Sequence, residues 1–356
     1  MSVATTGIRC MLMRGGTSKG AFFLADALPS DPAERDTLLL RVMGSPDPRQ
    51  IDGVGGAHPL TTKVAVVAPS ERAGIDLDYL FLQVAVDRPE VTDRQNCGNM
   101  LAAVGPFAVE RGLIDATDGQ TSARILMTNT DGVAVASFPV ENGLPVYAGD
   151  TEIAGVPGSA AGVRIDFEDI AGSSTGALLP TGRVLDEIAG IAVTLVDNGM
   201  PVVVLRASDL GVSGYESCEE LEANDDLRQK LERIRTRAGP MMNLGDVTGS
   251  TVPKLTLVAP PREGGAITTR TFIPHRCHQA IGVLGAVSVA TACLLPGSPA
   301  AGVARLSGET VRIEHPSGTF DAVIRLESED PPRVRSAGIV RTARKLMDGF
   351  VFPRDY

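Results

Sequence analysis

Residues 61–70, TTKVAVVAPS, recur in altered form at residues 252–261 as VPKLTLVAPP, and this pair of stretches is the main clue to the fold. Each stretch places a lysine, Lys63 or Lys254, at the start of an apolar run typical of a β-strand. Chance likeness between two apolar segments is common, so this match needs support from a second one in the same order.

That second match lies downstream of each lysine. NCGNMLAAVGPFAV at 96–109 aligns with RCHQAIGVLGAVSV at 276–289, with Cys97 opposite Cys277. Each stretch is nearly all apolar, which predicts a cysteine-led helix buried on every side, and in a mostly β chain we expect a sheet around it. The repeated order predicts duplicated domains related by a pseudo-two-fold axis. We also expect close strand contacts at Gly105 and Gly285 and a kink at Pro106.

The rest of the chain reads mainly as strands. Alternating or turn-centred patterns predict a strand or hairpin at 74–87, 123–138 and 310–326. A helix should begin with the cap Asp31 and Pro32 and stop by Gly44. The charge-laced segment 216–237 is typical of a solvated surface helix.

Composition limits the function classes. The 356 residues suit two domains, and the net charge of −10 with no tryptophan argues against a nucleic-acid partner. No apolar run approaches about 18 residues and no signal-like N-terminus is present, so we expect a cytoplasmic protein without a membrane partner. Five scattered cysteines and four histidines lack zinc or disulfide spacing, and neither a metal nor a cofactor is expected.

Cys97 is the first candidate for chemistry. It is flanked by Asn96, Gly98 and Asn99 at the expected start of a helix, a polar setting that favours a reactive thiolate. The alternative is a small buried hydrophobe, the usual state of a free cysteine. For Lys63, a solvated side chain is the simpler interpretation, because lysines are rarely buried; a desolvated Lys63 would serve as a general acid or base.

The stretch MLMRGGTSKGAFFLAD at 11–26 has the glycines and the cation of an anion site but not the order of a P-loop. A carboxylate could be bound here by Arg14, Gly15, Ser18 and Lys19. Two further polar residues, Arg276 and His278, are expected to flank the start of the second helix. Together these residues predict an acidic substrate and proton transfer next to a carboxylate or carbonyl, without a cofactor.

Several stretches closely resemble the PrpF family over nearly the whole chain: MLMRGGTSKGAFFLADALP, GSPDPRQIDGVGGAHPLTTKVAVV, NCGNMLAAVGPFAVERGL, GALLPTG, DNGMPVVVL, FIPHRCHQAIGVLGAVSVATACL and GIVRTARKLMDG. That family contains 2-methylaconitate isomerases of propionate metabolism. It also contains the 4-oxalomesaconate tautomerases and Δ-isomerases of gallate and protocatechuate 4,5-cleavage, which these stretches resemble more.

The resemblance implies an α+β, diaminopimelate epimerase-like fold, with two pseudo-symmetric domains that each wrap a mostly antiparallel sheet around a central apolar helix. The expected domains are 1–184, with a tail of about 335–356 packing back on it, and 185–334, with the Cys277-led helix. The active site is expected in the cleft between them. The oligomeric state is left open, a homodimer being one option.

The resemblance also implies that Lys63 and Cys97 transfer the proton, in place of the two cysteines of related epimerases. Our hypothesis takes Lys63 as base and Cys97 as acid, and the reverse assignment stays open. The substrate is expected to be a tricarboxylate, most closely 4-oxalomesaconate; 2-methylaconitate and a non-catalytic tricarboxylate-binding protein are the alternatives. The expected substrate-binding residues are Arg14, Gly15, Ser18, Asn96, Gly98, Asn99, Met100, Gly199, Met200, Arg276 and His278.

Overall fold

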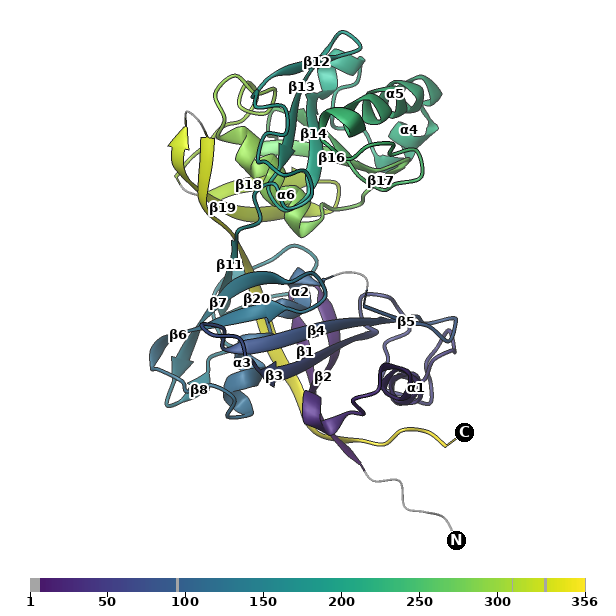
Figure 1. The fold of residues 1–356 in the computed structure, drawn as a ribbon, viewed down its shortest axis with the longest axis vertical. Coiled ribbons are helices and arrows are strands. Elements are labelled where there is room, and N and C mark those ends of the chain that lie inside the picture. The colour runs from purple at the N-terminus through teal and green to yellow at the C-terminus, as the bar shows by residue number, and fades with distance from the viewer. Residues whose placement is uncertain (1–6, 94–95, 309, 330–331, 356) are drawn as a thin grey trace. The chain divides into compact units, whose positions relative to one another are not determined.

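The computed structural model describes residues 7–93, 96–308, 310–329 and 332–355. Contacts divide the chain into two compact units: unit 1 comprises Met1–Asp166 and Val340–Tyr356, and unit 2 comprises Phe167–Ile339. The C-terminal strand, yellow in Figure 1, therefore begins in unit 2 and lies from Val340 onward among the N-terminal strands of unit 1. The expected domain boundary after residue 184 stays a prediction, while the contacts divide the chain after Asp166.

Unit 1 is built on a closed ring of strands. Their order around the ring is β1, β2, β3, β4, β6, β7, β11 and β20, with β20 pairing back with β1. The ring removes exposed edges, which a sheet of this length would otherwise leave unpaired. The strands are β1 (Ile8–Gly15), β2 (Ser18–Leu24), β3 (Lys63–Pro69), β4 (Leu77–Val84), β6 (Gly119–Met127), β7 (Gly132–Glu141), β11 (Gly162–Glu168) and β20 (Pro332–Val351), with short β5 (Val91–Thr92), β8 (Leu144–Pro145), β9 (Thr151–Glu152) and β10 (Ser159–Ala160).

The first apolar segment of unit 1 forms two short helices, α2 (Gly98–Leu101) and α3 (Val104–Glu110). Pro106 explains the break, because a continuous helix would need its missing N–H and would press its ring on the carbonyl of Ala102. The chain instead restarts at α3, where Pro106 lies in the first turn and needs no partner. The predicted kink is thus a full interruption upstream of the proline. Every residue from Met100 to Val109 is buried.

One glycine of the first helix is required by packing. A Cβ on Gly105 would lie 2.4 Å from Cε1 of Phe138 on β7, so the predicted close strand contact is confirmed there. The outer face of the sheet is covered by α1 (Pro32–Met43), which begins after the Asp31 cap and ends at Gly44, as predicted. Asp31 accepts a hydrogen bond from the Glu34 N–H, and Gly44 is left-handed. A 3₁₀ turn, η1 (Ala25–Ala27), precedes it.

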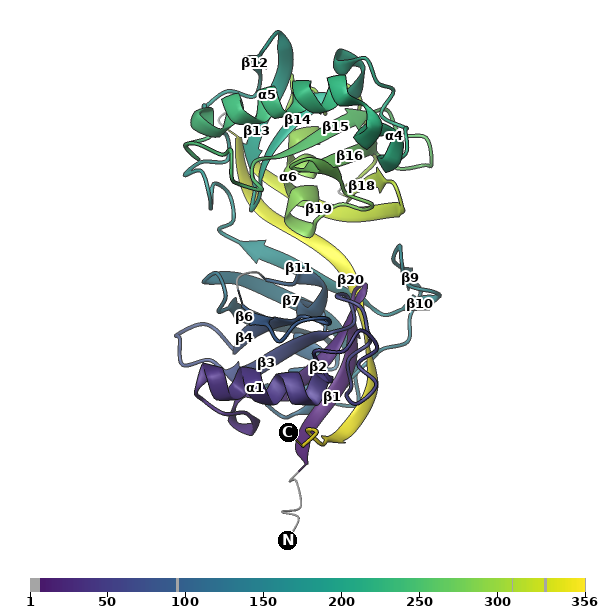
Figure 2. The same cartoon turned by 90° about the vertical axis from the view of Figure 1, so that its right-hand side faces the viewer.

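Unit 2 repeats the pairing order of unit 1 (Figures 1 and 2). In both, an antiparallel pair (β1–β2; β13–β14) joins in parallel to a strand that begins with lysine (β3; β15), which then pairs antiparallel with the next strand (β4; β16). That strand pairs in parallel with the first strand of a hairpin (β6–β7; β18–β19). The unit 2 strands are β12 (Asp186–Ile188), β13 (Ile191–Asp197), β14 (Pro201–Arg206), β15 (Lys254–Ala259), β16 (Ile267–Ile273), β17 (Arg276–Cys277), β18 (Thr310–His315) and β19 (Gly318–Glu329).

The second apolar helix, α6 (Val283–Cys293), packs against β13, β14, β18 and β19 and is buried from Gly285 onward. The prediction that Cys277 leads this helix is wrong. Cys277 lies in β17, paired with Phe272, and the helix begins only after Gly282, whose extended backbone forms the N-cap. The close strand contact expected at Gly285 is also wrong, because a Cβ there meets nothing within 4 Å beyond its own helix.

The charged segment after β14 and the 3₁₀ turn η2 (Ala207–Leu210) is not a single solvated helix. It breaks at Asn224 into α4 (Cys218–Ala223) and α5 (Asp225–Met241), because Asn224 in extended backbone ends one helix and caps the next. One face of α5 is buried in the core of unit 2, including the guanidinium of Arg235, which bonds to the Val247 and Ser250 carbonyls. The apolar residues of α5 recur at helical spacing and lie on its buried face. The many charged residues of the segment favoured the prediction of a solvated helix and made this spacing hard to recognise.

The other strand predictions hold. Residues 77–84 of the predicted strand form β4, and both hairpins form, with Met127 paired to Gly132 and His315 paired to Gly318. The left-handed φ of 58° at Asp131 suits the turn of the first hairpin. These hairpins are equivalent in the two pairing schemes, which strengthens the evidence for an internal repeat.

Candidate active site

Lys63 is the first residue of β3 and is held by strands on both sides. It is paired with Gly20 of β2 and Gln83 of β4. Only 6% of the residue is exposed, so the simpler interpretation of a solvated lysine is wrong. Its Nζ donates a 2.7 Å hydrogen bond to Gln83 Oε1 and lies 4.9 Å from the centre of the Phe81 ring. The lysine is therefore buried with a neutral acceptor and an aromatic face as neighbours.

Cys97 is half-buried and precedes the single turn of α2 as its N-cap. Its carbonyl accepts a 3.3 Å hydrogen bond from the hydroxyl of the fully buried Tyr79, and its Sγ lies 4.0 Å from Ser18 Oγ. Asn96 donates to Thr130 Oγ1, which ties the preceding residue to the β6–β7 turn. Cys97 is the free thiol that combines partial exposure with polar neighbours; Cys10, Cys218, Cys277 and Cys293 are buried.

Strand alternation places these two residues on one face of unit 1. Tyr79, Phe81 and Gln83 are two residues apart on β4 and share a face. Lys63 contacts Phe81 and Gln83, and Cys97 contacts Tyr79. Ser18, next to the thiol, shares its face of β2 with Gly20, the neighbour of Lys63. The structure therefore brings Lys63, Cys97 and Ser18 to the same face of the ring.

The glycines of the β1–β2 hairpin allow α2 to approach this face. A Cβ on Gly15 would lie 2.4 Å from the Asn99 carbonyl, and one on Gly20 would lie 2.5 Å from Met100 Cε. Asn99 Nδ2 also donates to Thr17 Oγ1 over 3.1 Å. Gly15 and the fully buried Met100 thus act in packing the hairpin on α2, whatever contact they also make with a ligand.

Arg14 and Lys19 lie elsewhere. They are paired with each other across the hairpin, and alternation turns both to the opposite face from Ser18. Arg14 donates to the Gly16 carbonyl (2.9 Å) and to Thr342 Oγ1 (2.8 Å) on β20, and burial together with Arg344 lowers its pKa. The structure does not bring Arg14 and Ser18 together as one cradle; Arg14 instead braces the glycine turn.

In unit 2, the expected binding residues fall into two groups. Gly199, with a left-handed φ of 88°, and Met200 form the β13–β14 turn, which is held to α6 because Ser288 Oγ donates to the Met200 carbonyl over 2.7 Å. A buried carboxylate, Asp197, precedes them and accepts from the Ser174 and Thr175 N–H groups; burial raises its pKa.

The second group surrounds Cys277, which is 6% exposed and donates its N–H to Glu222. Burial, and next the neighbouring Cys218 thiol, raise the Cys277 pKa, so this thiol is held in its neutral form. Arg276 is ion-paired with Glu222 at 2.8 Å. Burial, and then the charge of Lys254, lower the His278 pKa.

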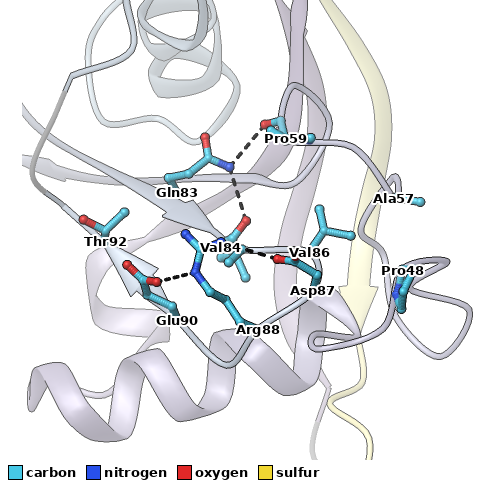
Figure 3. Close-up of a pocket in the computed structure, with 11 residues that line it drawn as sticks. Pro48, Ala57, Pro59, Gln83, Val84, Val86, Asp87, Arg88, Glu90 and Thr92 are labelled. Carbon is cyan, nitrogen blue, oxygen red and sulfur yellow. Dashed lines mark hydrogen bonds and ion pairs between the residues drawn. The ribbon is translucent and has the colours of Figure 1, made fainter. Parts of the chain in front are cut away.

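Sequence reasoning missed Gln83, Tyr79 and Thr342. The sequence does contain a signal for Gln83. The inward-facing residues of β4 alternate along the strand, and Gln83 is the one amide among them: Leu77, Tyr79, Phe81 and Gln83. Gln83 also forms part of the wall of a cavity of about 450 Å³ (Figure 3). The cavity is lined by Pro48, Ala57, Pro59, Gln83, Val84, Ala85, Val86, Asp87, Arg88, Glu90 and Thr92.

Among the described residues, no group of three or more histidine, cysteine, aspartate or glutamate side chains is arranged to hold a metal ion. Nor is any described helix both long enough and apolar enough to cross a bilayer.

Comparison with known proteins gives matches over almost the full length. The chain is 60% identical to the (4E)-oxalomesaconate Delta-isomerase of Novosphingobium sp. strain KA1, covering 96% of each chain. It is 57% identical to the 4-oxalomesaconate tautomerase of Pseudomonas putida strain KT2440, covering 97% of this chain and 96% of that one.

Solved structures also match the fold of this chain over almost its full length. A methylitaconate-delta-isomerase matches with a TM-score of 0.91 at 34% identity, covering 98% of this chain and 96% of that one. A hydroxyproline epimerase from Agrobacterium vitis matches with a TM-score of 0.54 at 14% identity, covering 98% and 93%, which places the fold among epimerase-like folds. The family model described as PrpF protein matches residues 5–353, and the chain therefore belongs to the PrpF family.

Proposed function

We propose that this protein is a cofactor-independent isomerase that moves a proton on 4-oxalomesaconate. The observation that carries the proposal is the near full-length identity of 60% and 57% to two proteins named for isomerisation or tautomerisation of that acid. The geometry supports it, because Lys63 and Cys97, the two groups able to exchange protons, lie on one face of unit 1.

The proposed chemistry is general acid–base catalysis. The Lys63 amine removes a proton from carbon next to a carbonyl or carboxylate, and the electron pair moves into an enolate. The Cys97 thiol then returns a proton, either to the enolate oxygen or to a carbon two bonds away. Polar groups beside the thiol, the Ser18 hydroxyl foremost, are placed to stabilise the added negative charge.

The proposal extends to the fold of the two units. The repeated pairing order supports two copies of one diaminopimelate epimerase-like module, each a sheet around an apolar helix. In the second copy Lys254 begins β15 as Lys63 begins β3, while the sequence-aligned Cys277 is buried and neutral and lies in β17 and not at the start of the helix. This asymmetry favours a lysine–cysteine pair over a two-thiol mechanism.

The test is turnover by the purified full chain in EDTA. Loss of 4-oxalomesaconate is followed by its ultraviolet spectrum, and proton NMR in deuterated water locates the carbon that gains deuterium. We expect conversion with deuterium at one carbon for wild type and none for Lys63→Met. Turnover of 2-methylaconitate alone would contradict the assigned substrate, and binding without deuterium exchange would show a binding protein.

A further inference from the structure

We propose that Gln83 is a positioning residue that holds the Lys63 amine in place through a neutral acceptor in its buried site. The inference rests on the proposed role of Lys63 in proton transfer and adds a residue to it. Gln83 Oε1 accepts a 2.7 Å hydrogen bond from Lys63 Nζ. Within the described part of the chain, the structure gives Lys63 no ion pair with a carboxylate.

The amide of Gln83 is locked in one orientation. Its Nε2 donates to three backbone carbonyls, those of Pro59 (3.1 Å), Thr62 (3.0 Å) and Val84 (3.2 Å). An oxygen at that place could not donate to carbonyls, so a flipped amide would lose these bonds and would also turn its NH₂ toward the Lys63 amine. Figure 3 shows the Nε2 contacts to Pro59 and Val84 beside the cavity. Oε1 is therefore always presented to Lys63.

The choice of an amide over a carboxylate has a chemical consequence. An ammonium and an amine both carry N–H donors, so an amide oxygen can accept from either form. A glutamate at position 83 would instead favour the ammonium through its charge. A buried lysine that takes part in proton transfer gains from a partner that is fixed in place and can accept a hydrogen bond from either form of the amine.

Among the residues that the structure describes, the titratable groups that share the face of Lys63 are the Tyr79 phenol on β4 and the Cys97 thiol before α2. On the remaining elements packed against β3, the groups face away, are paired or are exposed: Lys19 on β2, Asp78 on β4, Glu110 on α3, which is paired with Lys345, and Asp26 on η1.

The experiment compares Gln83→Glu with Gln83→Met in the full chain. For Gln83→Glu we expect the limb of the pH–rate profile that reports Lys63 to move up by about one pH unit or more. That is the acidic limb if Lys63 is the base and the alkaline limb if it is the acid. Gln83→Met, which cannot accept the bond, should lower kcat by about tenfold or more. The control Gln120→Glu adds the same charge at an exposed position on β6 and should leave the profile in place.

A second readout does not depend on the substrate. The rate of Lys63 acetylation by acetic anhydride is measured against pH by peptide mass spectrometry, and its midpoint should move up in Gln83→Glu but not in Gln120→Glu. Unmoved midpoints and profiles in folded Gln83→Glu would overturn the proposal. A moved acetylation midpoint in a protein that does not turn over 4-oxalomesaconate would support the role of Gln83 and reject the proposed substrate.

Discussion

At the scale of single residues, the register of β3 decides what Lys63 can do. Pairing with Gly20 and Gln83 puts its side chain inside the ring, 94% shielded in a segment where composition alone favours solvent. Cys97 reaches the same face from α2, while Cys277 sits in a strand. The two aligned cysteines therefore have different surroundings, and they should differ in function.

We predict that Cys97→Ser and Lys63→Met each lower kcat/KM by about 100-fold or more, the scale of a general acid–base contribution. Both variants should still bind substrate, since binding relies on other groups. Cys277→Ser should lose far less, because its thiol is buried and held neutral. Lys254→Met tests whether the duplicated lysine contributes. Equal loss in folded Cys97→Ser and Cys277→Ser would replace the lysine–cysteine scheme with a two-thiol one.

Arg14 gives a second prediction at this scale. Its hydrogen bonds to the Gly16 carbonyl and Thr342 tie the glycine turn to β20, so Arg14→Ala should lower the free energy of unfolding by about 1–3 kcal/mol. Urea denaturation measures this, alongside KM. A raised KM with unchanged stability would instead show that Arg14 contacts the substrate directly.

At the scale of elements, the two apolar helices differ in how closely strands approach them. Phe138 is buried beside Gly105, so Gly105→Ala should overpack the site and destabilise the protein by about 1–3 kcal/mol. Gly285→Ala is the matched control in α6. With nothing within 4 Å of the added methyl, it should be neutral or stabilise by up to about 1 kcal/mol. Thermal unfolding measures the change in stability of both variants. Equal destabilisation would contradict the difference in packing around the two glycines.

The junction of α3 with β20 provides a pH prediction. Both terminal nitrogens of Arg111 donate to the Asp348 carboxylate at 2.8 and 2.7 Å, and this contact lowers the Asp348 pKa. Because the Asp348 pKa is lower in the folded than in the unfolded protein, the ion pair stabilises the fold fully at pH values above the unfolded-state pKa. This stabilisation is lost as the pH falls through the folded-state pKa. The pH window of this effect therefore lies below 3.8, the ordinary pKa of an aspartate carboxyl.

Asp348→Asn should accordingly cost about 1 kcal/mol at pH 7, and its difference from wild type should shrink as the pH falls below about 4. Denaturant unfolding at a series of pH values measures this. Asp131→Asn is the control, because its ion pair with Arg72 is exposed and should be worth less than about 0.5 kcal/mol. A constant difference for Asp348→Asn down to pH 2 would show that the charge of Asp348 is not what stabilises the junction.

At the scale of the whole molecule, the C-terminal strand completes the first unit. β20 pairs with β1 from Ile8↔Val351 to Gly15↔Ala343 and closes the ring. A chain ending at Ile339 should therefore leave β1 with an open edge, lose the Arg14–Thr342 bonds and fail to fold unit 1. A chain ending at Val351 keeps the ladder and is the control. Circular dichroism and turnover measure both, and an active chain ending at Ile339 would contradict the role of β20.

The sequence by itself determined the features that depend on neighbours along the chain: the Asp31 cap, the hairpins, the lysine-led strands and the internal repeat. These follow from turn residues, alternation and apolar runs that act over a few positions. Family membership was also readable, because it rests on residue identity. Cys97 is a candidate from its polar setting alone, whereas the role of Lys63 depends on the resemblance, since local pattern alone favours a solvated lysine.

Only the tertiary structure decided which residues share a face. A shift of one position along a strand turns a side chain to the other side, so Ser18 lies with Cys97 while Arg14, grouped with it by sequence, lies opposite. A short hairpin with Phe272 places Cys277 in β17 and not at a helix start. The pairing of β3 with β4 gives Lys63 its partner Gln83, twenty residues away. Contacts of this last kind depend on strand partners distant in the chain, and no local spacing encodes them.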